Sequence, residues 1–227
     1  MSRVVSDGCL AAQRGSELAL DRIELAAGEE LELLDPLHDS LLFAWDGGAE
    51  LDAEELGRGS AALVLAGENG VLRAGPEGLT ASRVTAGAAT DLHAPMGPPA
   101  RVVPLESAEL GAATGSRSFQ ILLGPHNGST RATMFAGSIP PGRAPWHYHL
   151  YDEIVLVRRG AGRVHFLDGG AEELAAGSAF RLEPREVHIV ENLGAHEELA
   201  VLGIFTPAGS PSAAYLTADV AATYVIR

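Results

Sequence analysis

The 227-residue sequence contains no lysine, and all sixteen of its basic residues are arginines. This absence excludes Schiff-base and P-loop chemistry, because both depend on a lysine amine. Cysteine is almost as scarce: Cys9 stands alone, so no disulfide can form within the chain, which fits a reducing compartment. No apolar run approaches the roughly 20 residues of a membrane span, and the opening MSRVVSDG lacks the apolar centre of a signal peptide. We therefore expect a cytoplasmic protein.

Positive charge is also in short supply. Thirty acidic residues against sixteen basic ones give a formal net charge of -14. Such a surface repels phosphate backbones and anionic lipids, so we expect neither a nucleic-acid nor a membrane partner. The hydrophobic fraction of 46% is large enough to bury a sizeable core and argues against wholesale disorder. The expected partner is a small molecule.

The apolar residues occur in short runs interrupted by glycine and acidic residues, such as LALDRIEL, LLFAWDGG, FQILL and AVLGIF. Runs of this length and punctuation predict β-strands joined by turns. Residues 51–56, LDAEEL, fit a helical turn or a charged hairpin equally well. The proline-rich stretch 91–104 is typical of a linker, and Ser210 followed by Pro211 predicts the start of a short helix.

Metal-binding side chains are concentrated in residues 142–160, GRAPWHYHLYDEIVLVRRG. Side chains alternate along a strand, so His147 and His149 are expected on one face. Glu153 begins the next apolar run, and a continuous face would bring two imidazoles and a carboxylate together. Imidazole with carboxylate suits Fe, Mn, Co, Ni or Zn. His188, in EPREVHIVEN, is a fourth candidate ligand.

These two stretches resemble the two motifs of the cupin superfamily. The first motif is a glycine, HxH, three residues, a glutamate, six residues and a glycine; here Gly142 lies one residue closer to the HxH than usual. The second motif is matched by Gly177, Pro184, His188 and Asn192, but Glu186 stands near the position of its turn glycine. The resemblance implies one divalent transition metal (Fe, Mn, Ni, Co or Zn) with four ligands: His147, His149, Glu153 and His188.

The first half of the chain repeats the pattern of the second half without its histidines. With Gly28 placed on Gly142, the alignment sets Leu33 on His147, Asp35 on His149 and Asp39 on Glu153, and a small shift sets Gly70 on His188. Together with the resemblance, the repeat implies an all-β bicupin with two tandem double-stranded β-helix (jelly-roll) barrels. We expect a degenerate, metal-free barrel at 1–90, a linker at 91–115, a metal-binding barrel at 116–208 and a tail at 209–227.

Two residues beside the predicted ligands, Tyr151 and Arg143, are candidates for facing a substrate. The remaining histidines are expected to be structural or surface residues: His38, His93, His126, His165 and His196. Burying four ionisable groups together without a metal would be costly, which favours a metal site over a hydrogen-bonded cluster.

Four protein ligands leave two positions open on an octahedral ion, as expected of a catalytic site. Cupins with this ligand set include dioxygenases, isomerases, aminohydrolases, lyases and oxalate decarboxylases. No second acid–base pair lies near the motif, and the strand face is rich in Val, Ile and Phe, which favours a dioxygenase. The alternatives are an aminohydrolase or sugar isomerase, and a non-catalytic module that binds a metal or small ligand. The resemblance also implies a homodimer.

Overall fold

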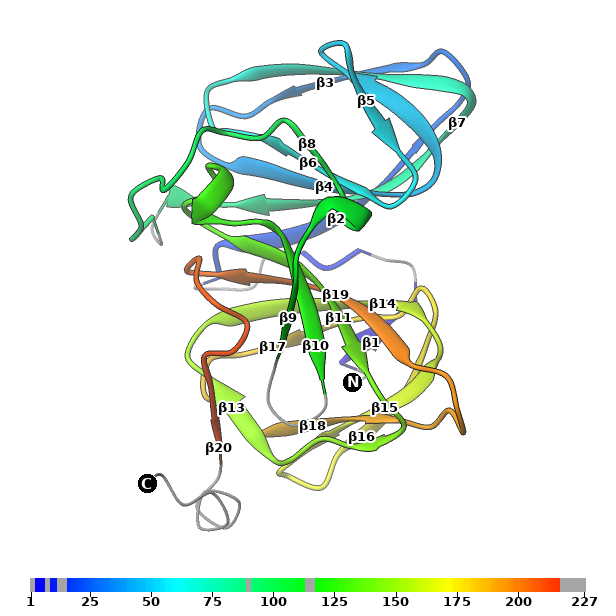
Figure 1. The fold of residues 1–227 in the computed structure, drawn as a ribbon, viewed down its shortest axis with the longest axis vertical. Coiled ribbons are helices and arrows are strands. Elements are labelled where there is room, and N and C mark those ends of the chain that lie inside the picture. Colours follow the sequence, from blue (N-terminus) through cyan, green and yellow to red (C-terminus); the bar gives the residue numbers. More distant parts are fainter. Residues whose placement is uncertain (1–2, 7–8, 12–15, 89–90, 113–116, 217–227) are drawn as a thin grey trace.

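A computed structural model describes residues 3–6, 9–11, 16–88, 91–112 and 117–216. It consists of two β-barrels, one stacked on the other (Figure 1). Parts of the predicted units lie outside the described residues: 1–2, 7–8, 12–15 and 89–90 of the first barrel, 113–115 of the linker, 116 of the second barrel and 217–227 of the tail. No helix in the described ranges is long or apolar enough to cross a membrane. The all-β prediction is confirmed.

The N-terminal barrel is one seven-stranded antiparallel sheet in which the long strands β4 and β7 curve around the barrel. Its strands are β2 (Leu18–Leu25), β3 (Glu30–Leu34), β4 (Asp39–Leu51), β5 (Glu54–Gly57), β6 (Ser60–Val64), β7 (Asn69–Ala86) and β8 (Val102–Pro104). Asp52 and Ala53, between β4 and β5, have φ values of 51° and 72°. Two successive positive φ values are typical of a tight hairpin turn. The sequence LDAEEL therefore forms the hairpin rather than the helical turn.

The C-terminal barrel has two facing sheets. The first comprises β1 (Val4–Val5), β9 (Leu110–Ala112), β10 (Ser118–Leu123), β11 (Thr133–Ile139), β14 (Asp152–Arg159), β17 (Ala179–Leu182) and β19 (Leu199–Thr206). The second comprises β12 (Gly142–Arg143), β13 (His147–His149), β15 (Ala161–Phe166), β16 (Ala171–Ala175), β18 (His188–Asn192) and β20 (Ala214–Leu216). Two short 3-10 turns, η2 (Leu105–Ser107) and η3 (Pro125–Asn127), precede and follow β10.

The helix predicted at Ser210 is wrong. Ala213 N–H donates to the Ser210 carbonyl in a single turn, and the chain then continues as β20. Strand β20 pairs along all of β13, so cross-strand hydrogen bonds replace the helical ones that the local Ser-Pro signal favours. Tyr215 of β20 also stacks on Tyr148 of β13, with ring centroids 5.4 Å apart.

Strands cross between the two units. Strand β1 pairs with β17 in the C-terminal barrel, although the chain goes on from β1 to the N-terminal barrel. The proline-rich stretch supplies β8, which pairs with β6 in the N-terminal barrel, and the residues after it supply β9, which pairs with β10 in the C-terminal barrel. Each barrel therefore includes backbone from outside its own continuous segment.

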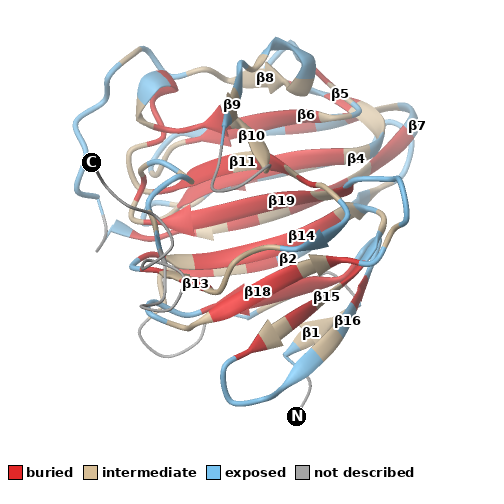
Figure 2. Ribbon diagram, turned by 60° about the horizontal axis from the view of Figure 1, so that its bottom comes forward, coloured by how far each residue is buried: buried red, intermediate tan, exposed pale blue. Residues whose placement is uncertain are grey.

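The two barrels pack against each other through a continuous apolar core, visible as the buried central strands in Figure 2. On β14, Ile154 and Leu156 belong to this shared core, whereas Val155 and Val157 belong to the interior of the C-terminal barrel. This alternation is the period of two expected of a strand buried on both faces. The N-terminal barrel thus covers the central part of one face of the sheet that carries Glu153.

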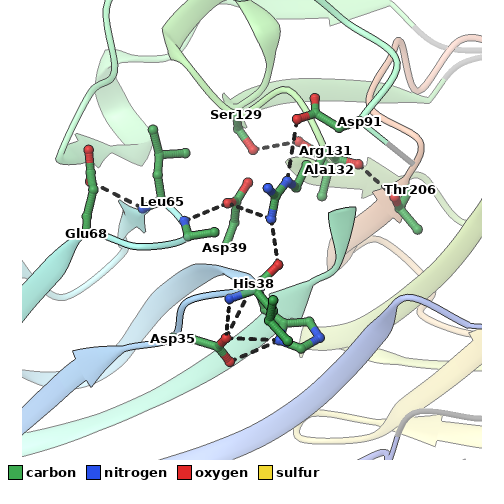
Figure 3. A network of polar contacts seen from close by, with 12 residues as sticks. Asp35, His38, Asp39, Leu65, Glu68, Asp91, Ser129, Arg131, Ala132 and Thr206 are labelled. Atoms are coloured by element: carbon green, nitrogen blue, oxygen red, sulfur yellow. Dashed lines mark hydrogen bonds and ion pairs between the residues drawn. The ribbon is translucent and has the colours of Figure 1, made fainter. Parts of the chain in front are cut away.

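Arg131 is a polar connection between the barrels (Figure 3). Its Nη1 lies 3.3 Å from Asp39 Oδ1 and donates to the Leu37 carbonyl at 2.8 Å, while its Nε lies 3.5 Å from Asp91 Oδ2. Burial raises the pKa of the Asp39 carboxyl, and the Ala66 N–H and Arg131 only partly oppose that rise. The guanidinium therefore compensates a carboxylate that the fold has largely removed from water.

The strand pairings in the two barrels can be compared at the positions that the repeat alignment matches. Leu33 pairs with Gly70 across β3 and β7, as His147 pairs with His188 across β13 and β18. Ser40 pairs with Val64, as Glu153 pairs with Leu182. The alignment of Asp39 with Glu153 is therefore wrong by one residue, and a one-residue slip exchanges the two faces of a strand. Ser40 takes the inward position, and the N-terminal barrel has no carboxylate there.

Candidate metal centre

Three strands from the two facing sheets of the C-terminal barrel bring all four predicted ligands together. His147 and His149 come from β13, His188 from β18 and Glu153 from β14, and all four residues are buried. The imidazole centroids of His147 and His188 are 4.4 Å apart, and those of His149 and His188 are 5.1 Å apart. All four line one cavity of about 90 Å³.

Each of the three imidazoles is held through its Nδ1 atom. The acceptors are backbone carbonyls, of Pro145 for His147, of Tyr151 for His149 and of Glu186 for His188, each at 2.9 Å. A carbonyl can only accept, so Nδ1 carries the proton and the lone pair of a neutral ring is on Nε2. This is the arrangement in which an outer hydrogen bond orients a histidine for metal ligation.

The surroundings also keep two of these rings neutral. Burial, together with the Arg117 guanidinium, lowers the pKa of His147 to about 4. Burial and the neighbouring histidines lower the pKa of His188 well below its usual value. At neutral pH both rings therefore present a lone pair rather than a proton, as a metal ligand must.

His149 differs from the other two histidines because it faces a carboxylate. Burial would lower the pKa of His149, but Glu153 and the Tyr151 carbonyl outweigh burial and raise it. Its Nε2 is 3.0 Å from Glu153 Oε2, yet this buried nitrogen makes no hydrogen bond of good geometry with any described residue. With Nδ1 donating to Tyr151, the neutral ring and the carboxylate direct lone pairs at each other. A shared proton or cation relieves that conflict.

The separation of these two atoms suits a metal ion. Two ligand atoms each ~2.1 Å from one ion and at right angles to each other are ~3.0 Å apart. Among the described residues, however, no three His, Cys, Asp or Glu side chains already have their donor atoms arranged around one point. Arg117 Nη1 instead donates to His147 Nε2 at 3.5 Å. The donor set fits a divalent transition metal, and closing it requires the guanidinium to withdraw from His147.

Aromatic stacking fixes the position of His149. The Tyr151 ring is stacked between the His149 imidazole, at 4.1 Å between centroids, and the Phe205 ring, at 4.0 Å. Burial raises the pKa of the Tyr151 phenol above its usual value, so it stays protonated. Tyr151 therefore lines the cavity and also fixes His149 through both its ring and its carbonyl.

Gly203 on β19 is a second element of this support. A Cβ atom built on it would lie 2.3 Å from the Phe135 ring and 2.7 Å from Glu153 Oε1. Only a residue without a side chain lets the ring and the carboxylate approach the backbone here. An isolated glycine within the run AVLGIF is the sequence signal for this position.

The structure does not bring Arg143 into the cavity. Its side chain is 57% exposed, and its Nε lies 3.0 Å from Glu191 Oε1 on the outside of the barrel. His165 pairs with the same glutamate, with 2.7 Å between His165 Nε2 and Glu191 Oε2. The arginine that lines the cavity is Arg117, which local motifs do not reveal because it lies 30 residues before His147.

Most of the remaining cavity wall is apolar, although Ser118 and Ser138 also line it. Seven described side chains from six strands form most of it: Phe119, Phe135, Ile139, Val155, Leu182, Val190 and Val201. Glu153 is the only carboxylate among the described lining residues. The site therefore combines a small apolar space, one cation and a set of metal-ligating atoms.

Comparison with known proteins agrees with this geometry. Residues 137–205, which include all four candidate ligands, match the family model described as "Cupin domain". The likeness to a cupin domain therefore covers most of the C-terminal barrel. No curated protein matches the chain in sequence.

Solved structures extend the likeness beyond the cupin domain to the whole chain. The oxalate decarboxylase of Bacillus subtilis, which has Mn(II) centres, matches with a TM-score of 0.73 and 16% identity, over 93% of this chain and 74% of that chain. The Lactobacillus farciminis oxalate decarboxylase in complex with formate matches with a TM-score of 0.73 and 15% identity, over 92% of this chain and 81% of that one. At these identities the likeness establishes the fold of two tandem cupin barrels; the reaction has to be argued from the site.

Proposed function

We propose that this chain is a metal-dependent enzyme that acts on a small organic acid inside its C-terminal cupin domain. One divalent transition metal, such as Fe or Mn, would be held by four side chains: His147, His149, Glu153 and His188. The observation that carries the proposal is the arrangement of the three imidazoles. Each ring donates from Nδ1 to a backbone carbonyl and leaves Nε2 for a ligand.

Arg117 supports an anionic substrate. Its guanidinium already lies 3.5 Å from His147 Nε2, so an ion entering the cluster would repel it. A substrate carboxylate bound between the metal ion and the Arg117 guanidinium would offset that repulsion. Arginine suits this role because its paired N–H donors match the two oxygens of a carboxylate. A neutral substrate would leave the two cations uncompensated in an apolar cavity.

The cavity also limits substrate size. A volume of about 90 Å³ is smaller than the ~150 Å³ apolar cavity that accommodates one benzene molecule. The substrate, or the part of it that enters, therefore has only a few heavy atoms. The apolar wall favours a short carbon skeleton beside the carboxylate.

Among the possible reactions we favour dioxygenation, in which both atoms of O₂ enter the organic product. When bound, the metal would supply a Lewis acid and a redox centre with open positions for substrate and oxygen. Arg117 would orient the carboxylate, Tyr151 would fix His149, and the apolar side chains would exclude water. Besides the ligands and Tyr151, no described lining residue is a ready proton donor or acceptor, and this absence disfavours isomerisation.

Decarboxylation of a small dicarboxylate is the second candidate. It is favoured by the likeness of fold to oxalate decarboxylases together with a cationic residue at the candidate ligands. In this reaction a carbon–carbon bond breaks, CO₂ leaves and a proton takes its place. The two candidates differ in whether oxygen is consumed.

The N-terminal barrel is proposed to be a degenerate cupin repeat with a structural role. At the positions equivalent to the four ligands it has Leu33, Asp35, Ser40 and Gly70. Its interior is filled by apolar side chains, including Leu33, Leu51, Leu56, Val64 and Leu72. It supports the catalytic barrel through the shared core.

The test begins with the metal content of untagged protein, followed by oxygen-electrode and product assays with small mono- and dicarboxylates. A dioxygenase consumes one O₂ per product with Fe or a similar redox metal. A decarboxylase releases CO₂ without net oxygen uptake. An aminohydrolase or isomerase would turn over without oxygen with Mn, Co or Zn, and ligand uptake with no turnover would indicate a binding module. Protein that retains no metal after reconstitution would contradict the proposal.

A further inference from the structure

A second concave site lies between the two barrels, separate from the metal cavity. It is a cleft of about 500 Å³ whose walls come from β4, β10, β11, β14 and β19. Three arginines line it, Arg58, Arg158 and Arg159, and Glu198 is the only carboxylate among the described lining residues. Arg58 also has a partner outside the cleft, with its Nη1 3.9 Å from Asp46 Oδ1. This cationic concentration is unusual in a chain with a net charge of -14.

Arg158 is the innermost of these cations. Arg158 follows Val157 on β14, and successive side chains of a strand point to opposite faces. The Arg158 side chain therefore lies on the same face as Leu156, between the barrels. The guanidinium carbon lies 5.3 Å from the centroid of the Phe43 ring. It makes no hydrogen bond or ion pair with any described residue, whereas most other arginines in the described part have a carboxylate within 4.0 Å. Burial, with Arg159 beside it, lowers the pKa of Arg158.

The cleft also holds an unsatisfied hydroxyl group. Ser138 Oγ on β11 is buried and has no hydrogen-bond partner among the described residues. Met134 and Ala136, which share its strand face, pack in the core between the barrels, so the alternation directs Ser138 toward the cleft. A half-buried cation and a buried hydroxyl, both without partners, are polar groups that an apolar environment penalises.

We propose that this cleft binds an oxyanion, a carboxylate or phosphate group of a small molecule, through the Arg158 guanidinium and the Ser138 hydroxyl. The guanidinium can donate two parallel hydrogen bonds to two oxygens of such a group, and the hydroxyl can donate a third hydrogen bond to one of its oxygens. Arg58 and Arg159, which are more exposed, add attraction at the rim. The cleft shares part of β10 and β11, including Phe119 and Ser138, with the metal cavity. The site is therefore distinct from the cavity but adjoins it.

The test measures anion binding to the full chain in a low-salt amine buffer. Inorganic phosphate and acetate are titrated separately by calorimetry and by thermal unfolding, with sodium chloride at equal ionic strength as the reference. Arg158→Met keeps an unbranched side chain but removes the guanidinium, and with it both the charge and the contact with the Phe43 ring. We expect it to weaken binding of the preferred anion at least tenfold, and Ser138→Ala to weaken it several-fold. The anion with the higher affinity identifies the group recognised.

Two control variants separate this site from other cations. Arg163→Met removes an exposed arginine that pairs with Glu173 on the outside of the C-terminal barrel, and it should bind the anion as the wild type does. Arg117→Gln should lose only the carboxylate site proposed in the metal cavity and should keep the anion site that Arg158→Met removes. Loss of binding in Arg117→Gln with retention in Arg158→Met would overturn the proposal, because the anion would then occupy the metal cavity.

Stability without anion gives an independent readout. If Arg158 is an uncompensated cation, Arg158→Met should unfold at the same temperature as the wild type or higher, and phosphate should no longer raise that temperature. If Arg158 serves only to pack on Phe43, the variant should be less stable and its response to anions unchanged. That second outcome, or a wild type that responds equally to chloride, would overturn the proposal.

Discussion

His147 and His188 lie directly opposite each other on β13 and β18, with imidazole centroids 4.4 Å apart. Each ring is fixed by a hydrogen bond to the backbone carbonyl two residues before it, that of Pro145 for His147 and that of Glu186 for His188. The two residues are 41 positions apart in sequence, so the pairing of β13 with β18 creates half of the candidate ligand set. The pair that the repeat aligns with them in the N-terminal barrel, Leu33 and Gly70, offers no metal-ligating side chain, and Leu33 packs in the core of that barrel.

Replacing either of these histidines with alanine should remove the metal. We expect about one equivalent in the wild type and almost none in His147→Ala or His188→Ala, because a four-ligand site loses a quarter of its donors. The measurement is elemental analysis of untagged protein. His38→Ala is the control, since the His38 imidazole pairs with Asp35 in the N-terminal barrel, away from the candidate ligands. Unchanged metal content in the two cupin-domain variants would show that the metal is bound elsewhere.

Gly203→Ala should disturb the site without touching a ligand. The added methyl would overlap the Phe135 ring and Glu153 Oε1, and the ring is confined by Phe119 and Phe205. We expect metal affinity to fall ~10–100-fold and stability to fall by ~1–3 kcal/mol. Metal titration and thermal unfolding measure the two effects. Gly57→Ala is the matched control, because its nearest atom would be 4.0 Å away; equal effects in both variants would count against the contact.

Arg117→Gln should impair substrate binding while leaving the metal in place. Losing a hydrogen bond to a charged group costs ~1.5–3 kcal/mol, which corresponds to a ~10–150-fold rise in the KM for an organic acid. Metal content should stay near the wild-type value, because no candidate ligand is removed. Steady-state kinetics with metal analysis on the same sample tests this. A variant with normal KM would exclude Arg117 as the carboxylate anchor.

Leu41→Ala should destabilise both barrels together. Leu41 is completely buried and packs in the core that the barrels share, so the truncation should cost ~2–5 kcal/mol. Because the core is continuous, calorimetry should show one unfolding transition that moves to lower temperature as a unit. Leu34→Ala, at a site that is 56% exposed, should shift it far less. A new, separate transition for the N-terminal barrel would show that the barrels unfold independently.

Glu191→Gln should alter stability in a pH-dependent way. Hydrogen bonds from Arg143 and then His165 lower the pKa of the Glu191 carboxyl below its model-compound value of 4.5. A lowered pKa in the folded state means that the carboxylate stabilises the fold above pH 4.5, and this contribution is lost as the pH falls through the folded-state pKa. The melting temperatures of the two proteins should therefore differ at pH 7 and converge in acid. A difference that persists or grows in acid would contradict this assignment.

Part of the site could be predicted from the sequence because it depends on short-range geometry. A two-residue spacing places His147 and His149 on one face of a strand whatever the fold around it. The run that begins at Glu153 alternates in the same way, and the structure buries Val155 and Val157 in the same interior. The all-β architecture likewise follows from short apolar runs punctuated by glycine.

The repeat alignment shows where this kind of reasoning fails. It placed Asp39 on Glu153, whereas the ladder between β4 and β6 gives that inward position to Ser40. Pattern matching tolerates an error of one residue, but a strand does not, because adjacent side chains point to opposite faces. Asp39 therefore lies between the barrels beside Arg131 rather than in the barrel interior.

The sequence by itself determined the strand-rich fold, the acidic surface and the residues able to bind a metal, since composition and local spacing suffice for these. Only the tertiary structure decided that Arg117 rather than Arg143 lines the cavity, that Gly203 makes room for Glu153, and that three arginines meet between the barrels. These relationships join strands separated by long stretches of chain. Their register depends on how the two barrels pack, and packing is a property of all the contacts together.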